Sequence, residues 1–464
     1  MVTTRREHKW LRYALGRSLW PDLLSALAAV VGVVALADYV IAYLAGALTS
    51  ANIAFAIIAS ASVVLSVVLI WRGRASYVRK ANAKLNATLA TKIASDLKIE
   101  LPSDYRTSGY ELVGGKHGFG FWSRYTTSQL FRKSGAKELS GTIRIRAGKF
   151  TGREDLRRSI GARNAVNAIR SQTLFRNDRK IRLRSNLLKA TWSGGNVELQ
   201  ETDYLASRIS NDISFQTISL RNAALDSPDE ATTEVLYDGL SFFLKTKAEG
   251  REFRGYCDTD CSNQIGVSTL AFTSDGYLLL VDQLSGGLES AELIAPSGSG
   301  SLDWEDLPSD PDGKDFWTWI TQAAKRELRE ELGLCHYSLS LLERIRHRHK
   351  VRWMKSLSIE PALIGIGGLM HRGGKPDLFF LAKLDCTVDD IRRYSVYGAE
   401  EKFLSQRCGL DAAKKLTDWT PQSVQELVGR NTTDRDSFPL ELCFLMLLEL
   451  CQTCPGELQS FLED

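Results

Sequence analysis

Two long apolar runs near the N-terminus dominate the hydrophobic pattern of the chain. The first covers residues 23–48, and the second follows an uncharged linker, residues 49–52, and ends at Trp71. As a helix, each run is long enough to cross a hydrocarbon layer of about 30 Å. Basic residues precede the first run and follow the second, which places both termini in the cytoplasm. The pattern predicts a two-span transmembrane hairpin over residues 1–72.

Asp38 lies inside the first apolar run, where an ionisable group costs free energy unless it is paired, protonated or in contact with water. It is therefore a candidate for a helix contact or for the lining of a pore. The alternative is a shorter first helix, with Asp38 near the far interface of the membrane. A cleavable signal peptide fits the run poorly, because the apolar segment of such a peptide has only about 7–15 residues.

The sequence of the middle of the chain predicts a mixture of helices and strands. Residues 74–98 contain no Gly or Pro, and apolar residues recur at Leu85, Leu89 and Ile93. This spacing predicts an amphipathic connecting helix within residues 73–100. We interpret residues 101–250 as a basic α+β linker region, whose glycines between residues 114 and 120 are typical of turns rather than of a phosphate-binding loop.

The linker region carries a local excess of positive charge. Residues 141–190 contain fourteen Lys or Arg residues and only three acidic residues. Such a segment attracts anions, which include nucleotide ligands, acidic lipid headgroups and nucleic acids. A solvated basic face is the alternative. The sequence shows no nucleic-acid reader motif, so we expect no nucleic acid polymer as a partner.

The sequence of the last part of the chain predicts both strands and helices. Residues 265–281 form two apolar segments joined by a turn signal at residues 274–276. Residues 315–332 carry apolar side chains at helical spacing, and Gly333 follows as a helix-ending glycine. The apolar segment that opens at Pro439 has only about thirteen residues and predicts a buried core helix rather than a third span.

Three carboxylates gather at the end of the predicted helix 315–332. Glu327, Glu330 and Glu331 are spaced at i, i+3 and i+4, so they lie on one helical edge. Oxygen ligands in this arrangement suit Mg²⁺ or Mn²⁺, which in turn hold a diphosphate. Arg326 lies one turn before Glu330 and can pair with it. The alternative is an acidic helix end that only offsets neighbouring basic residues.

Residues 326–334, with the sequence RELREELGL, match the second half of the box G-x5-E-x7-R-E-U-x-E-E-x-G-U, in which U is aliphatic. In this segment the chain resembles the Nudix family. The resemblance implies a Nudix-like α/β domain over residues 251–464, with a mixed sheet between helices. It also implies metal binding by Glu327, Glu330 and Glu331, and catalytic roles for Arg326, Glu330 and Glu331.

The first half of the box departs from the family pattern. If Gly300 takes the position of the box glycine, Asp306 stands where glutamate is expected, and nineteen residues rather than seven separate it from Arg326. We expect Gly300 and Asp306 in the ligand-binding site. The longer loop and shorter carboxylate affect hydrolysis more than binding, because a reacting water needs tighter positioning than a bound ligand.

Basic residues alternate downstream of the box at Arg344, Arg346 and Arg348. On a strand, this spacing places the arginines on one face, where they can take phosphates. A charged strand edge that discourages pairing with other chains is the alternative. Glu400 and Glu401 are further candidates for a base or metal ligand from a late loop.

The composition narrows the class of protein. With 464 residues, 44% of them hydrophobic, the chain is long enough for two or three folded units and is neither disordered nor fibrous. The net charge of +4 favours no particular partner. Eight cysteines without regular spacing exclude a disulfide framework and suit a reducing compartment.

A short two-span hairpin joined to a nucleotide-recognising domain resembles the membrane effectors of bacterial anti-phage systems that are signalled by cyclic oligonucleotides (CBASS). The resemblance implies a domain that senses a cyclic oligonucleotide, forms homo-oligomers and disrupts the lipid bilayer. The alternative is a membrane-anchored pyrophosphohydrolase that acts on a nucleoside-diphosphate-type substrate with Mg²⁺. Either function places a multi-pass protein in the bacterial inner membrane, with its soluble domains in the cytoplasm.

Overall fold

The computed structural model describes most of the chain after residue 97. The described residues are 39–41, 43, 45, 84–87, 98–154, 156–157, 177–222, 233–283, 293–336, 339, 341–396 and 414–463. The chain divides into two compact units. The first comprises Met1–Asn86, Arg153–Asn177 and Thr217–Tyr237, and the second comprises Ala87–Gly152, Asp178–Gln216 and Asp238–Asp464. Most of the predicted hairpin over residues 1–72, including Asp38, lies outside the described residues.

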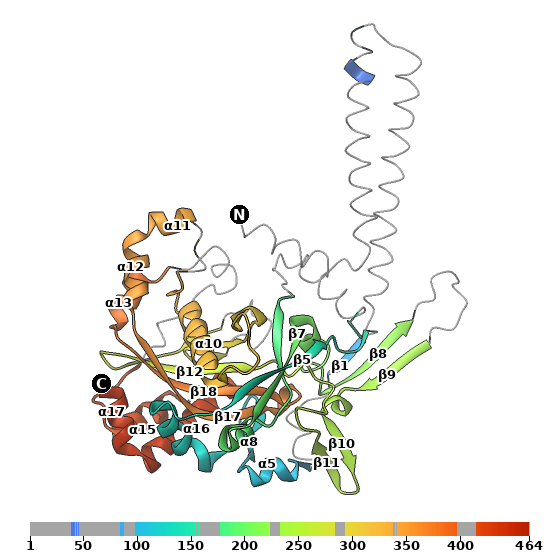
Figure 1. The fold of residues 1–464 in the computed structure, drawn as a ribbon, viewed down its shortest axis with the longest axis horizontal. Helices are drawn as coiled ribbons and strands as arrows, with labels where there is room; N and C mark the ends of the chain where they lie inside the picture. The colour runs from blue at the N-terminus through green and yellow to red at the C-terminus, as the bar shows by residue number, and fades with distance from the viewer. Residues whose placement is uncertain are drawn as a thin grey trace. The chain divides into compact units, whose positions relative to one another are not determined.

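The first unit contains a three-stranded sheet. Its strands are β1 (Lys84–Ala87), β8 (Gln216–Asn222) and β9 (Thr233–Asp238), in the order β1-β8-β9 (Figure 1). Strand β1 shows that the prediction of a continuous connecting helix over residues 73–100 was wrong. Its sequence, KLNA, alternates polar and apolar residues with the period of a strand, and the helical spacing of Leu85 and Leu89 concealed that alternation.

A mixed sheet of eight strands forms the centre of the second unit. Its order is β19-β13-β12-β18-β17-β4-β3, and β16 pairs with β12. The strands are β3 (Glu111–Gly114), β4 (Phe119–Trp122), β12 (Gly266–Thr273), β13 (Tyr277–Leu279), β16 (Gly298–Ser301), β17 (Ile359–Leu369), β18 (Lys375–Leu384) and β19 (Lys414–Lys415). Strands β12 and β18 run parallel, and the other pairs are antiparallel.

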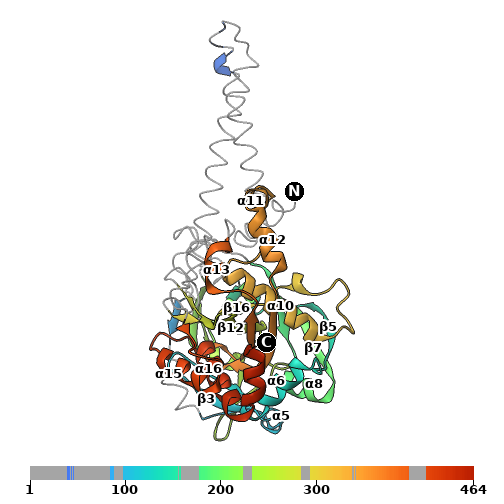
Figure 2. The ribbon, with the colours of Figure 1, turned by 90° about the vertical axis from the view of Figure 1, so that its left-hand side faces the viewer.

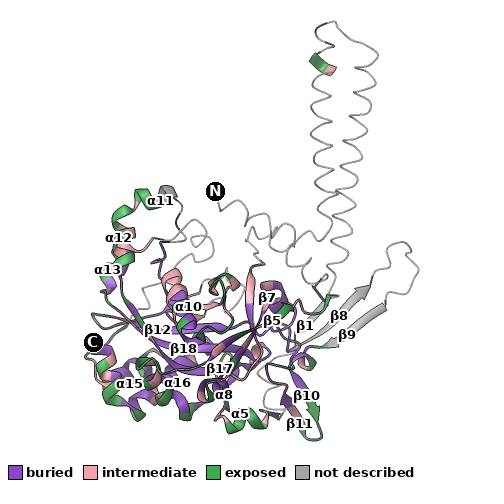
Figure 3. Cartoon of the chain, viewed as in Figure 1, coloured by how far each residue is buried: buried purple, intermediate pink, exposed green. Residues whose placement is uncertain are grey.

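Helices cover both faces of this sheet (Figures 1 and 2). On one face, Leu270 and Phe272 of β12 pack in a core with α6 (Thr127–Gly135), α15 (Pro421–Asn431), α16 (Phe438–Thr453) and α17 (Pro455–Glu463). On the other face, Ala271 packs in a core with α10 (Phe316–Glu331) and α13 (Val388–Tyr394). The alternation follows from the two-residue period of a strand. Figure 3 shows the burial of these central strands.

Three smaller sheets complete the strands of the second unit. They are β5-β7-β6, β10-β11-β2 and β14-β15. Their bounds are β2 (Ile99–Glu100), β5 (Thr142–Lys149), β6 (Arg179–Leu183), β7 (Asn196–Asp203), β10 (Leu244–Lys247), β11 (Gly250–Phe253), β14 (Val281–Asp282) and β15 (Ile294–Ala295). Strand β7 leads directly into helix α9 (Tyr204–Arg208).

The remaining described helices are short. They are α5 (Ser103–Thr107), α8 (Leu187–Ser193), α9 (Tyr204–Arg208), α11 (Leu341–Arg346), α12 (Arg348–Ser356) and the 3-10 turns η2 (Arg124–Thr126), η3 (Gly239–Phe242), η4 (Trp304–Asp306) and η5 (Met370–Arg372). Among the described residues, no single helix has the length and apolar content to cross a membrane. In the same part of the chain, α16 and α17 have that length and apolar content only when taken together, and they meet at a bend of 113°.

The central sheet extends beyond the domain boundary predicted at residues 250–251. Strands β3 and β4 come from the predicted linker region, yet β4 pairs with β17 through Phe121 and Gly368. A side chain at Gly120 would collide with the carbonyl of Gly368, so a glycine permits this close pairing. The described part of residues 101–250 therefore supplies strands to the sheet as well as separate elements.

Candidate functional site

Helix α10 positions the carboxylates that the sequence singled out. Asp315 caps its N-terminus, since the Asp315 side chain accepts a hydrogen bond from the amide of Thr318 at 2.6 Å. Gly333 follows its C-terminus with a φ of 65°, in the left-handed region. The apolar stripe predicted for this helix is buried. Burial of the stripe leaves residues 326, 327, 330 and 331 on the adjoining edge of the helix.

Arg326 lies at the centre of four carboxyl groups. Its Nη1 donates to Glu330 Oε2 at 2.7 Å, which confirms the predicted pairing one turn on. Its Nη2 donates to Glu327 Oε1 and to Asp306 Oδ2, both at 2.7 Å. Asp303 Oδ2 is 3.9 Å from the same nitrogen. We call these five residues the Arg326 cluster.

The loop before α10 brings Asp306 to Arg326 in spite of its extra length. Turn η4 is fixed internally, because the amide of Asp303 donates to Asp306 Oδ2 at 2.9 Å. The indole of Trp319 on α10 donates to the carbonyl of Asp306 at 3.0 Å. These bonds hold the loop against the helix, so the nineteen residues between Asp306 and Arg326 do not separate the two side chains.

Gly300 also lies at the cluster. A Cβ atom at Gly300 would collide with the carboxylate of Glu327. Two residues earlier on β16, a Cβ at Gly298 would come within 2.7 Å of the Leu328 backbone. The two glycines therefore let helix α10 lie close against strand β16, which places Glu327 beside the strand.

Lys180 is a further member of the site that the sequence analysis missed. Its Nζ donates to the carbonyl of Ser301 at 3.0 Å and forms an ion pair with Asp303. Burial opposes its charge, but Asp303 outweighs burial and raises the pKa of Lys180. Lys180 lies on β6, 123 residues before Asp303, and no local pattern marks it within the basic region. Only the pairing of distant segments identifies it.

Burial perturbs the glutamates of α10. It raises the pKa of Glu327 to about 7, although the charge of Arg326 acts in the opposite direction. It raises the pKa of Glu331 to about 8, and the charges of Glu327 and Glu330 add to this effect. Burial raises the pKa of Glu330 as well. These carboxyl groups thus hold their protons more tightly than exposed glutamates do.

The donor set suits a hard divalent cation, but two of its carboxylates, Glu327 and Glu330, bind Arg326 in this arrangement. Glu327, Glu330 and Glu331 offer oxygen ligands, which Mg²⁺ and Mn²⁺ prefer. Among the described residues, no group of three or more acidic, His or Cys side chains converges as a metal site. A cation at this edge of α10 therefore requires that Arg326 release a carboxylate. Glu400 and Glu401 lie outside the described residues.

The predicted phosphate-binding arginines lie on helices, not on a strand. Arg344 and Arg346 belong to α11, and Arg348 begins α12. The prediction of a strand was wrong, because an alternating basic pattern also suits a helix exposed on most sides, and Arg and Lys favour helices. All three residues are exposed. The ring of Trp353 stacks on Tyr394 of α13 at 4.7 Å and fixes α12 in place.

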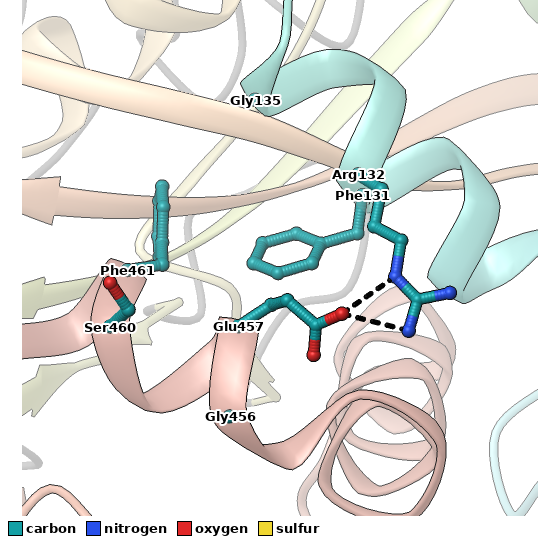
Figure 4. Close-up of a pocket in the computed structure, with 7 residues that line it drawn as sticks. All are labelled: Phe131, Arg132, Gly135, Gly456, Glu457, Ser460 and Phe461. Atoms are coloured by element: carbon teal, nitrogen blue, oxygen red, sulfur yellow. Dashed lines mark hydrogen bonds and ion pairs between the residues drawn. The ribbon is translucent and has the colours of Figure 1, made fainter.

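A pocket of about 590 Å³ lies between α6 and α17, among residues that pack on the other face of the sheet from α10. Figure 4 shows the rings of Phe131 and Phe461 at this pocket, with Arg132 paired to Glu457 at 2.9 Å. Because these two charges satisfy each other, the pocket offers no unpaired charge to an ionic ligand. We therefore place the candidate site at the Arg326 cluster.

Comparison with models of known protein families and with curated protein sequences gives no match to this chain.

Proposed function

We propose that the chain is a membrane-tethered receptor whose Arg326 cluster binds a nucleotide-type ligand, such as a cyclic oligonucleotide. In this proposal the bound ligand favours a homo-oligomer in which the hairpins pack together and open the bacterial inner membrane. The proposal follows the resemblance to CBASS effectors. The observation that carries it is the Arg326 cluster, in which Asp306 and the helix carboxylates meet at one guanidinium.

The cluster has the charge pattern of a site that responds to a cation and a phosphate. Four carboxyl groups surround Arg326, and Lys180 adds one more basic group. Burial of Glu327 and of the neighbouring Glu331 makes their ionised forms costly. A bound Mg²⁺ or Mn²⁺ would neutralise this charge and hold phosphate oxygens. Glu327, Glu330 and Glu331 would be its ligands, and Arg326 would orient the first two.

The tether is supported by the apolar runs of residues 23–71. Within this region, Tyr39, Val40, Ile41 and Tyr43 are helical, and the side chains of Val40, Ile41 and Tyr43 are exposed. Exposed large apolar side chains on a helix suit a lipid environment or a second helix. A ligand that switches such an assembly almost completely must bind the assembled state more tightly, by about 5.5 kcal/mol.

Purified full-length protein in dye-loaded liposomes tests the receptor proposal. We expect cyclic di- or trinucleotides with Mg²⁺ to release the dye, and the Glu330→Gln variant to need more ligand for the same release. Glu426→Gln, at an exposed ion pair on α15, is the matched control and should behave like the wild type. Binding of no cyclic nucleotide, or binding without leakage, would contradict the proposal.

A pyrophosphohydrolase is the second candidate function, and two observations favour it. Asp306 reaches Arg326 across the long loop, so the altered half of the box remains part of the site. Burial also raises the pKa of Glu331 to about 8, within the range in which a general base works at neutral pH. Release of nucleoside monophosphate or phosphate with Mg²⁺, measured on the same liposomes, tests this function. Turnover without leakage favours the hydrolase, and leakage without turnover favours the receptor.

A further inference from the structure

A second pocket lies beside the Arg326 cluster, between α10 and the segment that leads into β17. Its volume is about 290 Å³, and its polar lining includes Gln322, Lys325, Arg326, Arg329, Cys335 and Ser358. The Sγ of Cys335 is 4.0 Å from Glu330 Oε1. The pocket therefore adjoins the carboxylates without including them.

Two cations in this pocket lack carboxylate partners among the described residues. The Nη2 of Arg329 donates to the carbonyl of Leu357 at 2.8 Å, which anchors the guanidinium to the pocket wall. No described ion pair involves Lys325 or Arg329, although Glu360 acts on the charge of Lys325 from a greater distance. Among the described residues, the buried Nε atoms of Arg326 and Arg329 have no hydrogen-bond acceptor. The pocket wall thus carries positive charge that described carboxylates do not pair.

We infer that this pocket binds a phosphate group, held by Lys325 and Arg329, of the ligand that the Arg326 cluster recognises. The identity of that ligand as a phosphorylated compound rests on the proposed function. Charge-assisted hydrogen bonds from Lys and Arg are the usual means of holding phosphate oxygens. The Ser358 hydroxyl and the Gln322 amide line the same pocket as additional polar groups.

The size of the pocket fits a part of the ligand rather than the whole. Pockets that enclose complete small molecules occupy about 300–1,000 Å³, and this one lies at the lower limit. A phosphate or diphosphate therefore fits inside, while the remainder of the ligand extends past Cys335 towards Glu330. This assignment replaces Arg344, Arg346 and Arg348, which the sequence analysis selected for the phosphates.

Calorimetry of the full-length chain with inorganic pyrophosphate, in the presence of EDTA, tests the inference without the metal. We expect one pyrophosphate to bind per chain. Lys325→Gln should weaken binding about tenfold, the usual cost of one charge-assisted hydrogen bond. Lys189→Gln, at an exposed lysine on α8, is the matched control and should bind as the wild type does. Absence of binding by the wild type, or equal affinity of Lys325→Gln, would overturn the inference.

Two further variants keep the test decisive. Arg329→Gln should also weaken binding, but it removes the contact with Leu357 and can affect folding. Ser358→Asp leaves that contact intact and adds a negative charge to the pocket, so it should abolish pyrophosphate binding. A folded Ser358→Asp variant that binds as well as the wild type contradicts the inference.

Different experimental results would contradict the phosphate pocket and the proposed receptor function. Pyrophosphate binding with no response to any cyclic nucleotide would reject the receptor and retain the pocket. A cyclic nucleotide response that Lys325→Gln leaves unchanged would reject the pocket and retain the receptor.

Discussion

At the scale of single residues, Arg326 stabilises a group of carboxylates that would otherwise repel one another. It pairs with side chains from both η4 and α10, so it joins the loop to the helix. Removal of one partner from a largely buried ionic group leaves uncompensated charge in a region of low polarity. Arg326 is therefore needed for the stability of the folded state, in addition to any role in ligand binding.

We expect Arg326→Gln to lower the free energy of unfolding by about 3 kcal/mol near neutral pH. Denaturant titration followed by tryptophan fluorescence measures this change. The loss should shrink in acid, because protonated carboxyl groups no longer repel one another. Arg430→Gln, at an exposed ion pair with Glu426, should change stability by at most about 0.5 kcal/mol. Equal effects of the two substitutions would contradict a central role for Arg326.

The raised pKa of Glu331 predicts that the stability of the folded chain depends on pH. Burial raises its pKa from 4.5 to about 8 in the folded state, so the folded chain holds this proton more tightly than the unfolded chain. The resulting stability is fully present below about pH 4.5 and is lost as the pH rises through about 8. Glu331→Gln should therefore flatten the fall in melting temperature between about pH 4.5 and pH 8. An unchanged pH slope in this variant would count against the prediction.

At the scale of elements, the sequence predicts structures whose signal is local. The turn at residues 274–276, helix α10 and its terminal glycine follow the predictions, because strand and helix periods and glycine conformations are properties of neighbouring residues. Helices α11 and α12 were mistaken for a strand because charged residues fit either period. The pairing of β4 with β17 and the contact of Lys180 with Asp303 join segments far apart in sequence, which no local pattern encodes.

The close approach of α10 to β16 gives a prediction at this scale. We expect Gly300→Ala to destabilise the chain by about 1–3 kcal/mol, because the new methyl group collides with the Glu327 carboxylate. Gly429→Ala on α15 is the control, since its Cβ meets no atom within 4 Å. That substitution should stabilise the chain by about 0.5 kcal/mol through helix propensity. Thermal unfolding of both variants shows whether each substitution raises or lowers stability. A Gly300→Ala variant with unchanged stability would contradict the observed packing.

At the scale of the whole molecule, the basic region is less available to anions than its composition indicates. Arg179 pairs with Glu201, Arg184 with Glu198, and Lys149 with Asp203, so acidic residues of β7 offset much of the described positive charge. The guanidinium of Arg182 is buried and donates to backbone carbonyls of Thr259 and Cys261. Local composition could not show this compensation, because the acidic partners lie outside residues 141–190.

We expect deletion of residues 1–72 to release the protein from the membrane, because the apolar runs lie in this segment and the described basic residues are largely paired. Sedimentation of cell membranes, followed by detection of the protein in both fractions, measures the change. The full-length chain is the control and should stay in the pellet after a high-salt wash. Retention of the truncated protein in the pellet would show that another part of the chain contacts lipid.

The ion pair between Lys180 and Asp303 has a consequence for the charge of the cluster. A cation drawn to Asp303 competes with Lys180 for the same carboxylate. The backbone of Lys180 is paired with β7 and stays in place, so only the ammonium group has to move. The positive charge that such a cation brings to the carboxylates is then partly offset by the charge that it displaces.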